Sequence, residues 1–581
     1  MNKYVKRMPP DQRVLDPDRV GMIAKNCNTY PVLVQALLNR GFKEDEVQRL
    51  IEDGSAKEFF HRPLKGAYEA AVSILKHLEA NHTIAIFADY DCDGITSGYV
   101  MYSGLKAIAK HIKSKSSIVL HYPQRKDGYG LSLDYCKEAA DNHTSCVITV
   151  DNGIATKKEQ QYLSSRNVEL IVTDHHEPSR EKLPECIIVD PCFSDLTRTY
   201  LAGVAVAANV IVTLADKVGH SIDYARFTPP VAIGTISDCM PMTYENACYI
   251  KEGLSYMNEG NACRFLEDLS KDIGTTPVDV SFDIAPLINS ASRMGDTRIG
   301  ASGFFTDEED KVNSIITKLN ELNNARKKAT NDAKKAVKSI QIESWERIVI
   351  YDGKGYQKGI HGIIAGEISK QYNEYPAFVY CAFPEEDTDR IICAGSVRCQ
   401  NEALDCIDLF DQLKSMGYVK MVAGHSSACV LQIYQDKMDS FRRAFASLYD
   451  DMELPPVVKT LDASLSLKAA YDTNLLRQLR DIPFTTQELP VFGISNVMIN
   501  RVYASKNNPN NIQLFMADST AAKSAWAWGW GEKYKKLGSP NEVHLVCSIQ
   551  QDFRSKTTLQ PTLHIIDMIP VHRKKDAYAA R

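Results

Sequence analysis

Several features that would assign this 581-residue sequence to a class of protein are missing from it. None of its 15 cysteines forms a Cys-x-x-Cys pair, which argues against a zinc site or a disulfide framework and favours free thiols in a reducing compartment. No apolar stretch follows the basic residues at the N-terminus, and no run of 18 uncharged apolar residues occurs. We therefore expect no secretory signal, no membrane span and a cytoplasmic location.

An excess of positive charge is also missing. Lys and Arg number 68 against 73 Asp and Glu, which gives a formal net charge of −5. The average field is therefore slightly repulsive to phosphates, and a nucleic acid would have to be held by a local basic groove. Hydrophobic residues (44%) and charged residues (24%) occur in the proportions of a globular protein. A chain of this length is expected to fold as about three to four domains.

The apolar pattern divides the chain into five segments. Residues 1–80 are typical of a helical segment that packs on the next domain, residues 81–305. In that domain, short apolar runs at 83–88, 146–150, 170–173 and 187–189 alternate with helical stretches, which predicts a parallel sheet covered by helices. Residues 306–340 predict a connecting helix, residues 341–452 a second α/β domain, and residues 453–581 an all-β domain of the kind that forms a small barrel.

Acidic residues follow the apolar runs of the first α/β domain. The runs lead into Asp89-Tyr90-Asp91-Cys92-Asp93, Asp151-Asn152-Gly153, Asp174-His175-His176 and Asp190-Pro191, and Asp238 follows a further apolar stretch. The carboxyl ends of parallel strands share one edge of a sheet, so these side chains are expected to converge. Such a cluster needs a cation to balance its charge, and oxygen ligands with imidazole suit Mn²⁺ or Mg²⁺.

Structural roles compete with functional ones for several of these residues. A single aspartate after a strand often caps the following helix, and Asp190 has this alternative. Trp526, Trp528 and Trp530 alternate, so a strand would present all three on one face. They would then form either a surface on which bases stack or, more commonly, part of the core of a small barrel.

The motifs around these residues resemble the DHH phosphoesterase superfamily, named for the triplet seen here as Asp174-His175-His176. FADYDCDGITS, VDNGI, VTDHHE and GTISDCMPM follow in the family's order, and INSASRMGDTRIG resembles its Asn/Arg motif. HGIIAGEIS, AGSVR and AGHSSA resemble the DHH-associated second domain, although Ala423 and Val430 stand where glycines are usual. The all-β C-terminus resembles the oligonucleotide-binding (OB) barrel of the family members that degrade single-stranded DNA.

The resemblance implies a role for each site residue. It implies that Asp151 bridges two metal ions, that Asp91 binds one of them, and that Asp93, His175 and Asp238 bind the other, with Asp89 as a further ligand. It also implies that Asp151, Asp174, His176 and Arg293 form the catalytic group, with His176 facing the scissile phosphate. Phosphates and the terminal nucleotide would be held by Asn289, Arg293, Ser396, Arg398, Gly424 and His425.

The function implied is a 5′→3′ exonuclease that releases nucleoside 5′-monophosphates from single-stranded DNA in recombination, repair or replication. Two Mn²⁺ ions are the expected cofactors, with Mg²⁺ as a substitute. The expected partners are single-stranded DNA and either a single-stranded-DNA-binding protein or a helicase, and the chain is expected to be a monomer. The alternatives are a phosphodiesterase acting on short oligonucleotides or cyclic dinucleotides, and a DNA-binding replication scaffold whose metal site has decayed.

Overall fold

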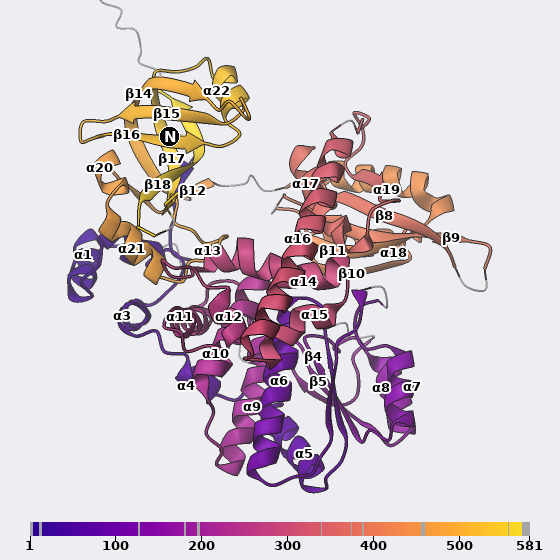
Figure 1. The fold of residues 1–581 in the computed structure, drawn as a ribbon. Coiled ribbons are helices and arrows are strands. Elements are labelled where there is room, and N and C mark those ends of the chain that lie inside the picture. Colours follow the sequence, from indigo (N-terminus) through magenta and orange to yellow (C-terminus); the bar gives the residue numbers. More distant parts are fainter. Residues whose placement is uncertain are drawn as a thin grey trace, which may run out of the picture.

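A computed structural model describes most of the chain (Figure 1). It covers residues 4–10, 14–125, 128–178, 182–194, 198–338, 340–372, 375–385, 388–401, 403–454, 459–552, 554–555 and 557–571. Among these residues, no helix has the length and apolar character needed to cross a bilayer.

The N-terminal segment is helical, as predicted, apart from one short strand. Its elements are β1 (Tyr4–Lys6), α1 (Pro17–Asn26), α2 (Pro31–Leu38), α3 (Glu44–Glu52), α4 (Lys57–Phe60) and α5 (Ala67–Glu79). The buried face of α5, formed by residues such as Ala70, Ala71 and Ile74, belongs to the core of the domain that follows.

The first lobe is built on a sheet of five parallel strands in the order β3-β2-β4-β5-β6. Its elements are β2 (Ile84–Ala88), α6 (Cys92–His111), β3 (Ile118–His121), α7 (Leu133–Asp141), β4 (Cys146–Val150), α8 (Lys157–Ser165), β5 (Glu169–Thr173), β6 (Ile187–Val189), η2 (Pro191–Phe193) and α9 (Gly203–Val218). One face packs against α5, α6 and α9, and the other against α7 and α8. The four predicted strands are confirmed, and β3 is an additional strand that the apolar pattern did not reveal.

Helices complete the first lobe and lead to the second. They are α10 (Tyr224–Ser237), α11 (Tyr244–Asn258), α12 (Arg264–Asp268), α13 (Pro277–Asp279), the π-helix η4 (Val280–Ile284), α14 (Ala285–Met294), α15 (Thr297–Ser302), η5 (Gly303–Phe305) and α16 (Glu309–Val337). The long helix α16 confirms the predicted helical connection. Asp238 lies at the C-terminal cap of α10. It therefore reaches the site from a helix, and grouping it with residues that follow strands was wrong.

The second lobe contains a mixed sheet in the order β10-β11-β9-β8-β7. Its elements are β7 (Val349–Asp352), η6 (Lys358–Ile360), α17 (His361–Gln371), β8 (Ala377–Pro384), β9 (Ile391–Arg398), α18 (Cys406–Ser415), β10 (Met421–His425), β11 (Ala428–Tyr434), η7 (Gln435–Lys437) and α19 (Met438–Asp450). One face is covered by α18 and α19. The other face packs against α16 and α17 along β7, β8 and β9, while Ala423 on β10 and Val430 on β11 are exposed.

The C-terminal part is mainly β, with strands in the order β16-β15-β14-β17-β18 and β13 beside β14. Its elements are β12 (Lys459–Leu461), β13 (Ala463–Ser464), α20 (Leu467–Ala470), α21 (Thr473–Asp481), β14 (Phe492–Ala504), β15 (Ile512–Ala517), β16 (Ala522–Ala527), α22 (Gly531–Lys536), β17 (Glu542–Gln551) and β18 (Pro561–Pro570). The end strands β16 and β18 are in contact. Closure into an OB barrel stays a prediction, as do the five domain boundaries.

The three C-terminal tryptophans do not share one strand face. Strand β16 ends at Ala527, so Trp526 lies within it, while Trp528 and Trp530 follow it. Trp530 is buried, whereas Trp526 and Trp528 stack on each other with ring centroids 5.4 Å apart. The prediction of one common face was wrong because the strand is too short to hold all three.

The N-terminal segment also contacts the C-terminal part. Strand β1 pairs in parallel with β12, and the Tyr4 hydroxyl donates to Asp567 at 3.0 Å. The guanidinium of Arg40 binds the buried carboxylate of Asp462 at 2.8 Å. The N-terminal segment therefore joins the first lobe to the C-terminal strands.

Candidate metal centre

Acidic and imidazole groups meet at the carboxyl edge of the first sheet. Three groups of ligand atoms each lie within 4.8 Å of one another: Asp89, Asp91 and Asp151; Asp93, His175 and Asp238; and Asp151, His175 and His176. Asp151 and His175 each occur in two groups, so the three groups form one continuous cluster. All six predicted metal ligands are thus brought together by the fold.

Asp91 and Asp93 each accept hydrogen bonds from the start of a helix and also belong to the cluster. Asp91 Oδ1 caps helix α6, accepting hydrogen bonds from the backbone N–H groups of Asp93 and Gly94 at 3.0 and 3.1 Å. The carboxylate of Asp93 accepts from the N–H groups of Gly203 and Val204 at the start of α9, at 2.7 and 3.0 Å. Helix starts favour negative charge, so these contacts hold both carboxylates in place at the cluster.

The backbone at Asp151 has an uncommon conformation. Its φ is 62°, in the left-handed region, and Gly153 two residues later has a φ of 117°. This turn brings Asp151 Oδ1 to 3.1 Å from His175 Nε2. A Cβ atom at Gly203 would lie 2.5 Å from Asp151 Oδ1. Only glycine at position 203 leaves room for this carboxylate, so the start of α9 closely fits the cluster.

The carboxyl groups of the cluster disfavour one another's ionisation. Burial and the charge of Asp238 raise the pKa of Asp93 to about 7. Burial and the charge of Asp91 raise the pKa of Asp238 to about 7. Burial followed by neighbouring carboxylates also raises the pKa values of Asp89 and Asp151 well above the ordinary range. A bound cation would remove this conflict.

Unpartnered polar atoms point to the same conclusion. Within the described parts of the chain, four buried atoms of the cluster lack a hydrogen-bond partner: Asp89 Oδ1, Asp151 Oδ1, His175 Nε2 and Asp238 Oδ2. Asp151 Oδ1 and His175 Nε2 lie 3.1 Å apart but form no hydrogen bond. Burial, followed by the charge of His176, lowers the pKa of His175, so its ring is neutral and can present a lone pair. Orphaned carboxylate oxygens beside a neutral imidazole are suitable ligands for a divalent ion such as Mn²⁺. The donor set therefore fits a metal ion.

Asp174 has a supporting position beside this cluster. Its Oδ2 accepts a hydrogen bond from the N–H of Ile154 at 2.8 Å. Its Oδ1 accepts from the N–H of His175 at 2.8 Å and also lies 2.8 Å from His176 Nδ1. Burial opposes protonation of His176, but the Asp174 carboxylate outweighs it and raises the pKa of His176 to about 10. Asp174 thus orients His176 and keeps its imidazole positively charged.

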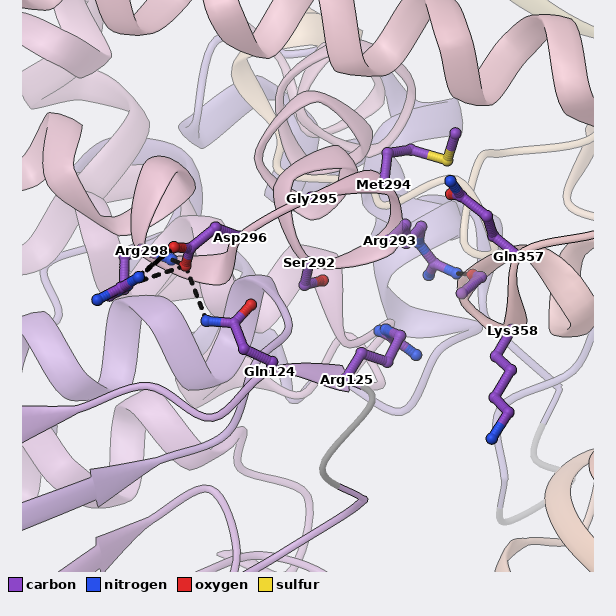
Figure 2. A pocket seen from close by; sticks show the side chains of 11 residues that line it. Gln124, Arg125, Ser292, Arg293, Met294, Gly295, Asp296, Arg298, Gln357 and Lys358 are labelled. Atoms are coloured by element: carbon purple, nitrogen blue, oxygen red, sulfur yellow. Dashed lines mark hydrogen bonds and ion pairs between the residues drawn. The ribbon is translucent and has the colours of Figure 1, made fainter.

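Cationic side chains line the other side of the site. A cavity of about 520 Å³ lies between α14 and η6, and its lining includes Arg125, Arg293 and Lys358 (Figure 2). Burial, followed by the charges of Arg125 and Arg398, lowers the pKa of Arg293 to about 9. Asp296 neutralises Arg298 at the cavity's far end. The crowded, mutually repelling cations are suited to an anionic ligand such as a phosphate.

The predicted nucleic-acid-binding residues differ in what they contact. Arg293 Nη1 donates to the Gly359 carbonyl oxygen at 2.7 Å, which fixes its guanidinium between the lobes. The Asn289 side-chain oxygen instead accepts from the Cys92 N–H at 3.0 Å, so it helps to position α6. The His425 ring stacks on His176, with centroids 5.4 Å apart and planes 22° from parallel.

The remaining predicted residues lie at the ends of strands in the second lobe. Gly424 has a φ of 128°, and a Cβ there would lie 2.7 Å from the Ala428 oxygen, so the turn before β11 requires glycine. Ser396 and Arg398 are half-buried on β9. Burial lowers the pKa of Arg398.

Two residues that the sequence reasoning missed complete the site. The Arg125 guanidinium lies over the Tyr90 ring, 4.2 Å from its centroid, beside the cavity. The hydroxyl of Tyr129 lies 3.2 Å from His176 Nε2. Both belong to the stretch between β3 and α7, where Gly128-Tyr129-Gly130 is the one visible signal of a specialised loop.

The comparisons with known proteins agree with this geometry. A model of the DHH family, N-terminal domain, matches residues 83–235. The chain is 26% identical over 449 residues to the single-stranded-DNA-specific exonuclease RecJ of Bacillus subtilis, covering 75% of this chain and 54% of that protein. It is 31% identical over 313 residues to RecJ of Thermus thermophilus, covering 53% and 45%. The chain thus aligns with about half the length of these two relatives.

A solved structure shows the same fold over nearly the whole chain. The crystal structure of RecJ from Thermus thermophilus in complex with Mn²⁺ matches with a TM-score of 0.76 at 21% identity, covering 98% of this chain and 80% of the other. A second crystal structure of that protein, in complex with Mg²⁺, matches with a TM-score of 0.71. Residues 83–235 therefore match the DHH family, N-terminal domain, and nearly the whole chain has the fold of RecJ from Thermus thermophilus.

Proposed function

We propose that this chain is a metal-dependent exonuclease that cuts single-stranded DNA from its 5′ end and releases nucleoside 5′-monophosphates. The main support is the convergence of unpartnered buried carboxylates and His175 beside a cavity lined with Arg125, Arg293 and Lys358. One side of the site suits divalent cations and the other suits phosphates. The exonuclease names of the relatives point the same way.

The metal ions are assigned to the ligand groups described above. We propose two Mn²⁺ ions, replaceable by Mg²⁺, with Asp89 and Asp91 holding one, Asp93, His175 and Asp238 holding the other, and Asp151 between them. Divalent cations at such a site activate water and neutralise charge that develops on the phosphoryl group. The donor set has both the oxygen atoms and the imidazole that Mn²⁺ accepts.

The protein's own residues position the DNA. Arg125, Arg293 and Arg398 bind the phosphates, because their positive charges repel one another until an anion lies between them. His176, held protonated by Asp174, faces the scissile phosphate and stabilises the charge on its oxygens. The contact between His176 and His425 brings the two lobes together at the site, and this close approach favours one strand over a duplex as substrate.

The wider setting follows from the same proposal. The β-rich C-terminal part would hold the strand away from the cut through basic and aromatic side chains, as oligonucleotide-binding barrels do. We propose a monomer that acts in DNA recombination, repair or replication in the cytoplasm, with a single-stranded-DNA-binding protein or a helicase as its partner.

Digestion of single-stranded DNA labelled at either end tests the proposal. Wild-type protein with Mn²⁺ should release labelled mononucleotide first from a 5′ label, and chelator should stop the reaction. Asp151→Ala should remove turnover while the circular dichroism spectrum is unchanged, because its loss breaks the link between the ligand groups. Normal turnover by Asp151→Ala, or release from the 3′ label first, would contradict the proposal. Faster cleavage of a dinucleotide than of a long strand would favour the short-oligonucleotide alternative.

A further inference from the structure

One apolar side chain of the second lobe is exposed where its strand is otherwise buried. Strand β11 lies between β9 and β10, and its residues Cys429, Leu431 and Ile433 are buried in the core formed with α18 and α19. Val430 points to the opposite face and is 43% exposed. A valine on an interior strand is normally covered on both faces of the sheet or packed against a neighbouring element. Its exposure therefore needs a reason.

The strand register places Val430 among residues proposed to bind the DNA. Val430 pairs with Ser396 on β9 and with Ala423 on β10, so these three side chains share one face. Two positions along the strands, about 7 Å away, the same face carries Arg398 and His425. Val430 is thus the largest apolar side chain in the row that it forms with Ser396 and Ala423, and the next row on the same face carries Arg398 and His425.

This face is directed towards the metal centre. Helix α17 packs on this face over β8 and β9, where Ile364 contacts Ala377 and Val379. Val430 on β11 and Ala423 and His425 on β10 are exposed, and the His425 ring stacks on His176 of the first lobe. In Figure 1, β10 and β11 are drawn on the side of the second lobe that is nearer to the first lobe. A strand bound at the metal centre would therefore lie close to the sheet face that carries Val430.

We infer that Val430 is a specificity-determining residue, and that the sugar and base of the terminal nucleotide pack against its side chain. The inference rests on the proposed function. Arg398 and Ser396 supply charge and hydrogen bonds for a phosphate, whereas the isopropyl group of Val430 offers neither. It can contact the apolar surface of a nucleoside without reading its hydrogen-bonding edge. The site should therefore bind a terminal nucleotide that carries a base more tightly than one without, whichever base it is.

Two substrates and two variants test this inference. The substrates are 5′-phosphorylated single strands whose terminal nucleotide either carries its base or is an abasic analogue. Val430→Thr keeps a β-branched side chain of similar shape but adds a hydroxyl group. The matched control is Val119→Thr, because Val119 is 48% exposed on the first sheet, at its edge strand β3.

The expected readout is a change in KM with little change in kcat. In the wild type, removal of the terminal base should raise KM about five-fold, as expected for loss of contact with a partly exposed valine. Val430→Thr should lose most of that difference and cleave the abasic strand like the wild type, and Val119→Thr should keep the full difference.

An equal preference for the base in Val430→Thr and in the wild type would overturn the inference. So would a wild type that shows no such preference. Failure of the wild type to cleave either strand would instead count against the proposed exonuclease activity. If the wild type cleaves both strands in a metal-dependent reaction, the proposed activity holds, and the KM values then test the role of Val430 alone.

Discussion

Replacing Asp238 with asparagine should stabilise the metal-free protein. Burial and the charge of Asp91 raise the pKa of this carboxyl from 3.8 to about 7. Because this pKa is higher in the folded than in the unfolded chain, the free energy of unfolding of the protein falls as the pH rises from 3.8 towards 7. A difference of about three pKa units corresponds to about 4 kcal/mol. Because the side chain is 28% exposed, solvent screening makes the real effect smaller.

The assay is denaturation in the presence of chelator at two pH values. At pH 8, Asp238→Asn should raise the free energy of unfolding of the first lobe by up to about 4 kcal/mol, or its Tm by about 2–4 °C for each kcal/mol. At pH 4 the variant and the wild type should be nearly equal. With Mn²⁺ the wild type should be more stable than the variant, because binding of the ion stabilises the folded protein and the variant lacks one of the carboxylate ligands. A variant that is less stable than the wild type at pH 8 without metal would refute the reasoning.

Three further substitutions probe the fit of the site and the contact between chain segments. Gly203→Ala should lower turnover at least about a hundred-fold without unfolding the chain, because the new Cβ displaces Asp151. Calorimetry should show weaker Mn²⁺ binding by this variant, and normal binding would contradict the prediction. Asp462→Ala should lower the free energy of unfolding in urea by about 1–3 kcal/mol, since Arg40 loses its 2.8 Å contact with a buried carboxylate but keeps Glu488 at 3.0 Å; an unchanged free energy of unfolding would contradict it. Arg125→Ala should raise KM about ten-fold for a 5′-phosphorylated strand and less for a 5′-hydroxyl strand; equal changes would place Arg125 outside the phosphate site.

The metal centre is the part of the molecule that the sequence predicts best. Asp91, Asp151 and His175 follow buried apolar runs, and parallel strands bring their carboxyl ends to one edge. The capping alternative is confirmed for Asp190, whose Oδ1 accepts from the Cys192 N–H at 2.8 Å at the start of η2. Asp91 also acts as a cap, because it caps α6 and faces the cluster at once. One residue can satisfy both roles because a carboxylate has several lone pairs.

Other features depend on contacts that leave no local pattern. Asp174 resembles its neighbours in sequence, yet the fold surrounds it with hydrogen-bond donors and makes it a support for His176. Arg125 comes from a loop whose position depends on Tyr90, far away in the sequence. Strand β3 is short and lies at the edge of its sheet, so its apolar signal is weak.

The pairing of β1 with β12 has a consequence for how the chain is made. The partners of Tyr4, Val5 and Lys6 are Lys459, Thr460 and Leu461. During synthesis, the first strand emerges from the ribosome long before its partner exists, while the lobes between them can already fold. Strand β1 therefore stays unpaired until β12 has been made. In a nascent chain halted before β12, Tyr4, Val5 and Lys6 should be accessible to protease.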